Sequence, residues 1–426
     1  MMRATKDSGF EWIGIIPTEW ALSKIGQVYR LRNTKVSDTD YPPLSVTNKG
    51  IVPQLDTAAK TNAHDDRKLV KKGDFAINSR SDRRGSCGIS DFDGSVSLIN
   101  TILAPLNEMN PGYYDWLFHT VQFGDEFYKF GHGIVDDLWT TGWQEMKKIT
   151  IPTPPLPEQQ RIADFLDAKC AEIDALTADI QTQINTLEQY KRSVITETVT
   201  KGLNPATEMK DSGIDGAGVT PSHWKTTKLC YECYIRARLG WRGLKADEYV
   251  DEGYAFISAF NIQNGKLVWT PLNYITKERF DESPEIKLHS GDVLIVKDGA
   301  GVGKCARVDD LPMGGTAPNS SIAVITPSKN LDYRYVCYYL QSAVFNNFVL
   351  LLYNGMGVPH LTQEVMSKIK ILVPPLKEQM VISDYLDAKC TEIDAVVETK
   401  KSQLATLDEY KKSLIFEYVT GNKVVI

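Results

Sequence analysis

The sequence predicts an α/β protein built as a tandem repeat, in which each of two globular domains is followed by a long helix. Three observations predict this fold. The stretch "LDAKCAEIDAL" at residues 166–176 returns as "LDAKCTEIDAV" at residues 386–396, with nine of eleven positions identical. Apolar residues recur every seven positions through both segments, interrupted in the second by Lys400. Runs rich in Val and Ile, bounded by Gly and Pro, indicate strands in the regions between them.

The repeat extends beyond this stretch and divides the chain. "PPLPEQQRIADFLD" from Pro154 matches "PPLKEQMVISDYLD" from Pro374, and "KDSGFEWIGIIPTEW" from Lys6 matches "KDSGIDGAGVTPSHW" from Lys210. Between these anchors the two halves diverge. A repeat of this length has to be recognised first, because it determines the whole domain plan. We expect a first globular domain, a first long helix, a second globular domain and a second long helix at residues 1–153, 154–202, 203–373 and 374–426.

The repeated segments are predicted to be helices that pack on other helices. Both follow a Pro-Pro pair, and each has a glutamate in its first turn, where a carboxylate suits the positive helix end. A seven-residue apolar repeat is typical of coiled-coil packing, and two similar long helices most simply pair with each other. Helices that merely cover a sheet are the alternative, but these average only about 11 residues. The predicted seam consists of Leu166, Ile173, Ile180 and Leu187 in the first helix and Leu386, Ile393, Leu407 and Leu414 in the second.

The divergent regions are predicted to be α/β domains. "GDVLIVKD", "SIAVITP" and "IKILVPP" are typical strands. Residues 113–130 and 333–353 are predicted to be aromatic-rich helices. Their aromatic rings could stack on bases, but an aromatic stripe at helical spacing more often belongs to a core.

Known catalytic motifs are incomplete. "DGAGVGKCARV" at residues 298–308 has Asp298 where a phosphate loop needs glycine, and Cys305 replaces the magnesium-binding Ser or Thr. "CYEC" at residues 230–233 is a lone CxxC pair. "NPGY" at residues 110–113 is one residue short of the motif that holds a target base in amino-methyltransferases, and a turn is the better interpretation. We therefore expect a non-catalytic chain that holds no cofactor or metal.

Composition places the chain among cytoplasmic proteins. The seven cysteines are scattered without the spacing of a disulfide framework, which suits a reducing cytoplasm. No apolar run approaches the roughly 18 residues that would cross a membrane.

Positive charge is concentrated in two segments, although the whole chain has a net charge of -6. Each long helix sums to -4, with 4 cations against 8 anions at residues 158–200 and 5 against 9 at residues 378–420. Residues 60–84 carry 8 cations and 4 anions, and residues 225–245 carry 6 cations and 1 anion among Tyr and Trp. Such basic segments suit DNA phosphates and guanine edges, although a solvated loop is the alternative for any single arginine. The predicted DNA contacts here are Arg80, Arg83, Arg84, Arg236, Arg238, Trp241 and Arg242.

Taken together, these motifs resemble the specificity subunits of type I restriction-modification enzymes over essentially the whole chain. The most specific parts are the two Pro-Pro-Leu motifs, the "IPTEW" and "TPSHW" entries and the "GDVLIVKDGAGVGK" strand and turn. Leu156, Glu158, Gln159, Leu166 and Asp167 match the family pattern. The first half departs from it, with "GHGIVDDLWTTGWQEM" where the second half has the more usual "GMGVPHLTQEVM".

The resemblance implies two target-recognition domains, separated by two long helices that pair as an antiparallel coiled coil. Each domain would read one half of a bipartite site in double-stranded DNA, and Lys304 and His360 join the predicted DNA contacts. The helices would set the gap and dock two modification subunits, with restriction subunits joining them. S-adenosylmethionine, ATP and magnesium are then expected on the partner subunits and not on this chain.

Two other classes of protein remain as alternatives. One is a self-contained DNA methyltransferase or nuclease with recognition domains, for which the purified chain would bind S-adenosylmethionine by itself. The other is a coiled-coil adaptor that does not bind DNA. Salt-dependent and sequence-dependent retardation of duplex DNA by the assembled complex would exclude the adaptor.

Overall fold

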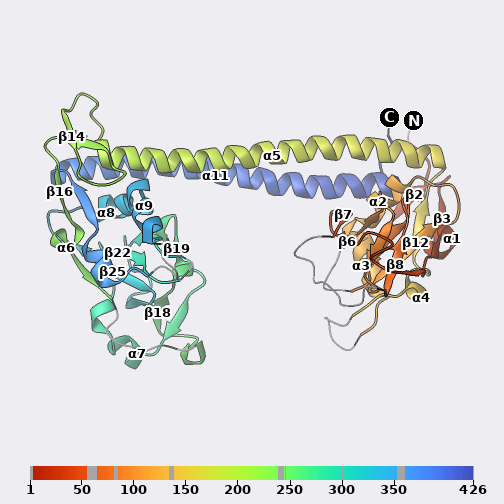
Figure 1. Cartoon of the computed structure of the whole chain (residues 1–426), viewed down its shortest axis with the longest axis horizontal. Helices are drawn as coiled ribbons and strands as arrows, with labels where there is room; N and C mark the ends of the chain where they lie inside the picture. The colour runs from red at the N-terminus through yellow and green to blue at the C-terminus, as the bar shows by residue number, and fades with distance from the viewer. Residues whose placement is uncertain are drawn as a thin grey trace. The chain divides into compact units, whose positions relative to one another are not determined.

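The computed structural model describes residues 3–54, 65–80, 85–133, 139–237, 244, 246–299, 301–352 and 360–425. The chain forms two compact units, one of Met1–Gln181 with Lys401–Ile426 and one of Thr182–Lys400. Each unit combines one globular domain with part of both long helices (Figure 1). The predicted boundaries treated each helix as a separate segment. In the structure each helix is instead divided between the two units.

The globular domain of the first unit is built on an antiparallel sheet in the order β10-β9-β12-β4. These strands are Cys87–Ile89, Phe75–Asn78, Asn100–Pro105 and Tyr29–Leu31. All four residues of β9 are buried, as expected for a central strand. Helices α2 (Pro111–Phe118) and α3 (Val121–Lys129) replace the single helix predicted at residues 113–130. The break is local, because the Thr120 side chain accepts a hydrogen bond from Phe123 N and starts a second helix.

The second unit has a six-stranded sheet in the order β17-β25-β22-β23-β20-β19. Its strands are Cys233–Arg236, Ile322–Pro327, Val293–Val296, Cys305–Arg307, Gly265–Leu267 and Ile262–Gln263. The three predicted strands are present as β22, β25 and β26 (Lys370–Val373), which pairs with β16 (Lys225–Lys228). The aromatic helix predicted at residues 333–353 is α8 (Tyr333–Gln341) followed by α9 (Ala343–Leu352).

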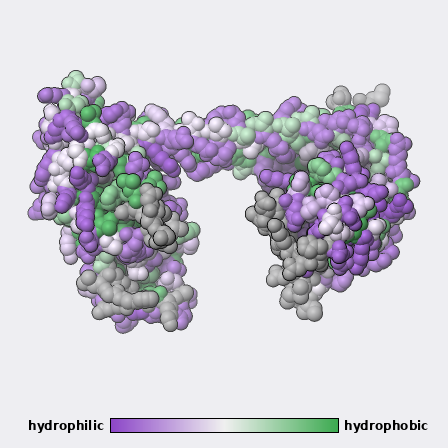
Figure 2. Space-filling view, in the orientation of Figure 1, coloured by the Kyte–Doolittle hydropathy of each residue, from purple (hydrophilic) through white to green (hydrophobic). Residues whose placement is uncertain are grey.

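The aromatic residues of these helices belong to the cores, as the sequence favoured. Tyr113, Tyr114 and Phe118 of α2 are buried, and so are Tyr335 and Tyr339 of α8. The end of α9 differs, because Leu350 and Leu351 are exposed. Figure 2 shows hydrophobic residues gathered on the surface of the second unit around α9.

The long helices are α5 (Leu156–Lys201) and α11 (Leu376–Val419). Within the first unit the start of α5 packs along the end of α11, and Lys411 Nζ lies 2.6 Å from Asp174 Oδ1. Within the second unit the end of α5 packs along the start of α11, and Lys191 Nζ lies 2.7 Å from Asp394 Oδ1. The pairing is therefore antiparallel in each unit. None of the helices in the described part of the chain combines the length and apolarity needed to cross a membrane.

The predicted seam residues lie along this pairing or in the adjoining domain cores. Six of them are buried and two are half-buried, namely Leu187 and Leu407. Leu166 and Leu414 belong to the core of the first unit, and Leu386 belongs to that of the second. Helix ends and globular domain therefore share one hydrophobic core in each unit.

Candidate nucleic-acid interface

The same hairpin occurs in both domains, with a loop of equal length. Residues 79–86, "SRSDRRGS", join β9 to β10, and residues 297–304, "KDGAGVGK", join β22 to β23. The strand registers agree, since Ile77 pairs with Cys87 and Ile295 pairs with Cys305. Each loop therefore leaves its sheet at the equivalent point.

A second segment is clamped against each loop by an equivalent backbone hydrogen bond. Thr141 N donates to Ser79 O at 3.0 Å in the first unit, and Leu361 N donates to Lys297 O at 2.9 Å in the second. The bonds place residue 140 beside residue 80 and residue 360 beside residue 298. Arg80 and Thr140 form a β-bridge, and His360 Nδ1 forms an ion pair with Asp298 Oδ1.

Three predicted DNA contacts are exposed at these loops. Arg80 is exposed, and its carbonyl oxygen accepts a hydrogen bond from the Tyr128 hydroxyl at 3.1 Å. Lys304 is exposed at the end of its loop, and its backbone N–H donates to Gly301 O at 3.0 Å. His360 is also exposed. The other predicted contacts Arg83, Arg84, Arg238, Trp241 and Arg242 lie outside the described residues.

The prediction for Arg236 is wrong, because its side chain is occupied inside the domain. Arg236 is 9% exposed. Its guanidinium lies 2.6 Å from the Asp292 carboxylate, which is only 1% exposed, and also donates to Lys287 O at 3.1 Å. If the guanidinium left the buried Asp292 carboxylate to contact DNA, that carboxylate would remain inside the domain as an unpaired charge.

The first domain contains the equivalent ion pair, and its position in both domains shows the structural role of this pair. Arg32 Nε lies 2.5 Å from Asp74 Oδ2, and this hydrogen bond raises the pKa of Arg32. Asp74 accepts from Lys71 N at 2.9 Å, and Asp292 accepts from His289 N at 2.8 Å. Each carboxylate closes the turn before a central strand, and each arginine ties that turn to the chain at the end of the strand two places away in the sheet, β4 in the first domain and β17 in the second.

Strand β17, which lies within the basic segment at residues 225–245, runs toward the hairpin end of the sheet. Arg236 pairs with Val324, while Val296 pairs with Ile322 at the end from which the hairpin loop departs. Strand β17 therefore ends toward that same end of the sheet. The end of β17, the hairpin loop and His360 converge there, and this sheet end is the candidate DNA-facing edge of the domain.

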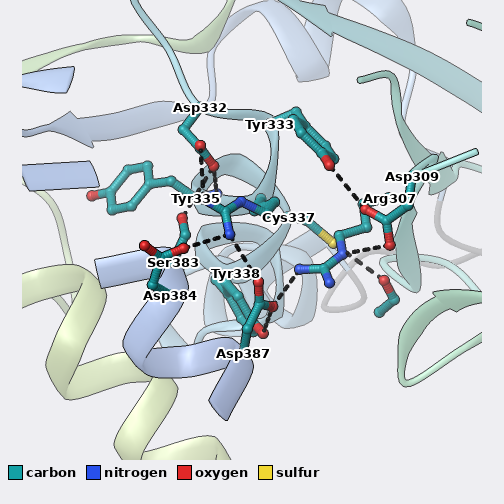
Figure 3. Close-up of polar contacts among 12 residues, drawn as sticks. Arg307, Asp309, Asp332, Tyr333, Tyr335, Cys337, Tyr338, Ser383, Asp384 and Asp387 are labelled. Carbon is teal, nitrogen blue, oxygen red and sulfur yellow. Dashed lines mark hydrogen bonds and ion pairs between the residues drawn. The ribbon is translucent and has the colours of Figure 1, made fainter. Parts of the chain in front are cut away.

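A separate polar cluster fastens the second domain to α11 (Figure 3). The Asp387 carboxylate accepts from the Tyr338 hydroxyl at 2.6 Å, from Arg307 Nη1 at 2.5 Å and from Arg334 Nη1 at 3.1 Å. Arg334 also reaches Asp384 at 2.7 Å. In the first unit the equivalent carboxylate, Asp167, accepts from the Trp116 indole at 2.8 Å.

Within its unit, each domain also contacts the C-terminal end of the long helix that follows the other domain in the sequence. Tyr113 donates to Val419 O, the last residue of α11, at 2.8 Å. Tyr335 donates to Val199 O, near the end of α5, at 3.2 Å. Each domain therefore holds the start of one helix and the end of the other.

The two cysteines of the CxxC pair are held within the protein by burial or by a hydrogen bond. Burial raises the pKa of the Cys233 thiol to about 12, and Cys230 Sγ donates to Ser367 O at 3.1 Å. Across the described ranges, no group of three or more His, Cys, Asp or Glu side chains is placed to hold a metal ion.

A duplicated hairpin scaffold, exposed cations at its loops and paired long helices define a DNA-recognition protein with two reading domains. The family described as Type I restriction modification DNA specificity domain matches residues 17–186 and 240–406, and the chain belongs to this family. Its role is therefore that of a DNA sequence-specificity subunit, which is not catalytic. This confirms the predicted family, fold class and role.

Known relatives agree with this assignment. The MjaVIII type I restriction enzyme specificity subunit of Methanocaldococcus jannaschii is 25% identical over 339 residues, covering 78% of this chain and 75% of that protein. The EcoKI specificity subunit of Escherichia coli is 24% identical over 209 residues, covering 48% of this chain and 44% of that protein.

Two solved structures share the fold. A chain from a study of complex assembly and conformational transition in the type I R-M system has a TM-score of 0.72 at 17% identity, covering 96% of this chain and 99% of that one. The crystal structure of the HsdS subunit from Thermoanaerobacter tengcongensis has a TM-score of 0.52 at 18% identity, covering 98% of this chain and 100% of that one.

Proposed function

We propose that each globular domain reads one half of a bipartite site in double-stranded DNA, through the sheet end that carries its hairpin loop. One observation carries this proposal. Both domains keep the same hairpin and the same backbone clamp, while the side chains displayed there differ. A constant scaffold with variable side chains suits two readers of different half-sites.

Two kinds of DNA contact are expected at these loops. Cations that meet phosphates hold the duplex and release counterions, whereas cations that meet base edges in the major groove discriminate sequence. Arg80 and Lys304 are exposed at the loops and suit either role. We extend the same roles to Arg83 and Arg84 of the first hairpin loop, and to Arg238 and Arg242 beyond β17, with Trp241 between them in the sequence.

The long helices are proposed to set the gap between half-sites and to dock two modification subunits. Several exposed residues are identical in both copies of the helix, although no core packing requires them. They include Ala168 with Ala388, Glu172 with Glu392, and Tyr190 with Tyr410. Two matching surfaces suit two copies of one partner. Restriction subunits would join through these partners.

The chemistry is assigned to the partner subunits. S-adenosylmethionine would be bound by the modification subunits, and ATP with magnesium by the restriction subunits. The seven cysteines of this chain are all free thiols, and six of them are buried. This fits the reducing cytoplasm, where we place the complex.

A domain exchange tests the proposal. Residues 22–150 are replaced by the matching domain of a relative, and methylated sites are mapped in cells by single-molecule sequencing. We expect one half-site to change and the other to stay. A matched exchange within residues 225–373 should change only the other half-site. A map in which either exchange alters both halves contradicts independent reading.

A further inference from the structure

The two hairpin loops display opposite charges at one equivalent position. Arg80 is the second residue of its loop, and Asp298 is the second residue of the other. Both follow a residue whose carbonyl accepts the clamp hydrogen bond, from Thr141 in one domain and from Leu361 in the other. The scaffold therefore presents an arginine in one domain where it presents a carboxylate in the other.

Asp298 is an unusual residue for a surface that meets DNA, because a bare carboxylate repels phosphates. A lysine and a histidine contact it here. Lys297 Nζ lies 2.5 Å from Asp298 Oδ2, and His360 Nδ1 contacts Asp298 Oδ1. The Asp298 side chain is nevertheless 31% exposed, and that of His360 is 52% exposed. The carboxylate thus keeps accessible acceptor surface at the candidate interface.

A purely structural role does not explain the ion pair. The bond from Leu361 N to Lys297 O already ties the two segments together, and the first domain makes the equivalent bond at 3.0 Å. There the neighbouring pair is Arg80 and Thr140, which meet through the backbone as a β-bridge. The same backbone arrangement therefore forms in both domains, although the side chains at these two positions are quite different.

We propose that Asp298 and Arg80 are matched specificity-determining residues, one in each domain. Asp298, held by His360, accepts a hydrogen bond from the exocyclic amino group of cytosine or adenine in the major groove. Arg80 donates to O6 and N7 of guanine. Carboxylates and arginines have these preferences because of the donors and acceptors on the base edges. This inference rests on the proposed function and assigns one base position in each half-site.

The test uses the chain assembled with its modification subunits and a library of duplexes randomised in one half-site at a time. Asp298→Ala removes the acceptor. We expect the preference at one position of the second half-site to fall by about 5- to 150-fold, while the first half-site keeps its preferences. Arg80→Gln should reduce a guanine preference in the first half-site by a similar factor and leave the second unchanged.

Asp298→Asn separates the two amino-bearing bases. An amide makes a bidentate pair with adenine N6 and N7, so an adenine preference should persist in this variant. A cytosine preference should weaken and shift toward adenine. Glu232→Gln is the matched control. Glu232 pairs with Lys225 and precedes β17 at the end of the sheet opposite the hairpin loop, so its loss should leave both half-sites unchanged.

The outcomes separate this inference from the proposed function. A wild-type complex that selects no bipartite sequence contradicts the proposed function itself. A wild-type complex that selects one, with Asp298→Ala selecting the same bases to the same degree, overturns only the inference. If Asp298→Ala binds no DNA, Asp298→Asn decides, because it keeps the side-chain volume. A cytosine preference that stays unchanged in that variant would also overturn the assignment. An amide can keep an adenine preference, so in that case Asp298→Leu decides, because it has similar volume and no acceptor, and an unchanged preference there would overturn the assignment.

Discussion

Arg32 and Arg236 occupy equivalent places in the two domains, and each neutralises a buried carboxylate at the turn before a central strand. Removing one partner of a buried ion pair leaves the other charge unpaired in a low-dielectric surrounding. The arginine therefore contributes to the stability of the domain and not to the DNA surface.

We expect Arg236→Ala to lower the free energy of unfolding by about 3–5 kcal/mol, measured by denaturant titration of the chain. The loss in Arg32→Ala should be smaller, because the Arg32 side chain is 21% exposed against 10% for Arg236. Lys304→Ala is the control, since an exposed loop residue should change stability by no more than about 0.5 kcal/mol. Near-native stability of Arg236→Ala together with weakened DNA binding would restore Arg236 as a DNA contact.

The Arg236 error shows what charge patterning can and cannot predict. The segment at residues 225–245 is basic, but its composition does not say which cation is buried. A signal was present, because Arg32 precedes Arg236 by 204 residues, the offset of the entry motifs. Asp74 and Asp292 lie in the matched "GD" turns. An arginine and an aspartate kept in both halves of diverged domains indicate a structural pair.

At the scale of elements, the two junctions between domain and helix are built differently around one repeated aspartate. Asp387 of α11 accepts from three donors, two of which are arginines. Asp167 of α5 accepts from the Trp116 indole. Hydrogen bonds to charged groups contribute more than neutral ones, so the junction of the second domain should depend more strongly on its carboxylate.

Asp387→Asn is expected to destabilise the chain by about 1–3 kcal/mol, and Asp167→Asn by less than about 1 kcal/mol. Thermal unfolding of the two variants beside the wild type measures the difference. The substitution is the same and the positions are equivalent in the repeat, so each variant serves as the control for the other. Equal losses would mean that the arginines add nothing to this junction.

The Asp387 junction should also depend on pH in a defined direction. Burial acts to raise the pKa of Asp387, but hydrogen bonds from Tyr338 and Arg307 outweigh it and hold the pKa below the usual 3.8. A lowered pKa stabilises the folded state above the unfolded value and loses that effect as pH falls through the folded pKa. The stability difference between wild type and Asp387→Asn should therefore be constant above about pH 5 and shrink below pH 3.8.

Element type was predictable from sequence, and element ends were less so. The Val and Ile runs form strands, and the seven-residue stripe forms long helices. The aromatic segments each form two helices, because single polar side chains start a second helix. "NPGY" starts the first helix of its segment, α2, since the Asn110 side chain accepts from Tyr113 N and Pro111 occupies the first turn. Periodicity describes a face of a helix and carries no information about its caps.

At the scale of the whole molecule, the sequence indicated the repeat but not how the helices are shared. Each compact unit includes the start of one long helix and the end of the other. The hydroxyl of Tyr113 bonds a carbonyl 306 residues away, at the end of α11. No local pattern marks such a contact, because a buried tyrosine has the same sequence signature whatever its partner.

The helices of 46 and 44 residues provide the last prediction, that their length sets the gap between half-sites. Four residues are inserted after Gln183 and four after Gln403, which are matched points of the repeat. A helix rises about 1.5 Å per residue, so each insertion adds roughly 6 Å and about one turn. At about 3.4 Å per base pair, the gap should lengthen by about two unspecified base pairs, with unchanged half-sites. Some activity should be lost because the reading faces rotate.

Methylation mapping in cells that express this variant measures the gap directly. An insertion after Gln183 alone is the control. It lengthens one helix and not its partner, so the pairing of α5 with α11 loses its register and the complex should assemble poorly. The matched insertion moves both helices together and keeps that register. If the matched variant methylates sites with the original gap at full activity, the helices do not determine the spacing, and the gap must be set by the partner subunits.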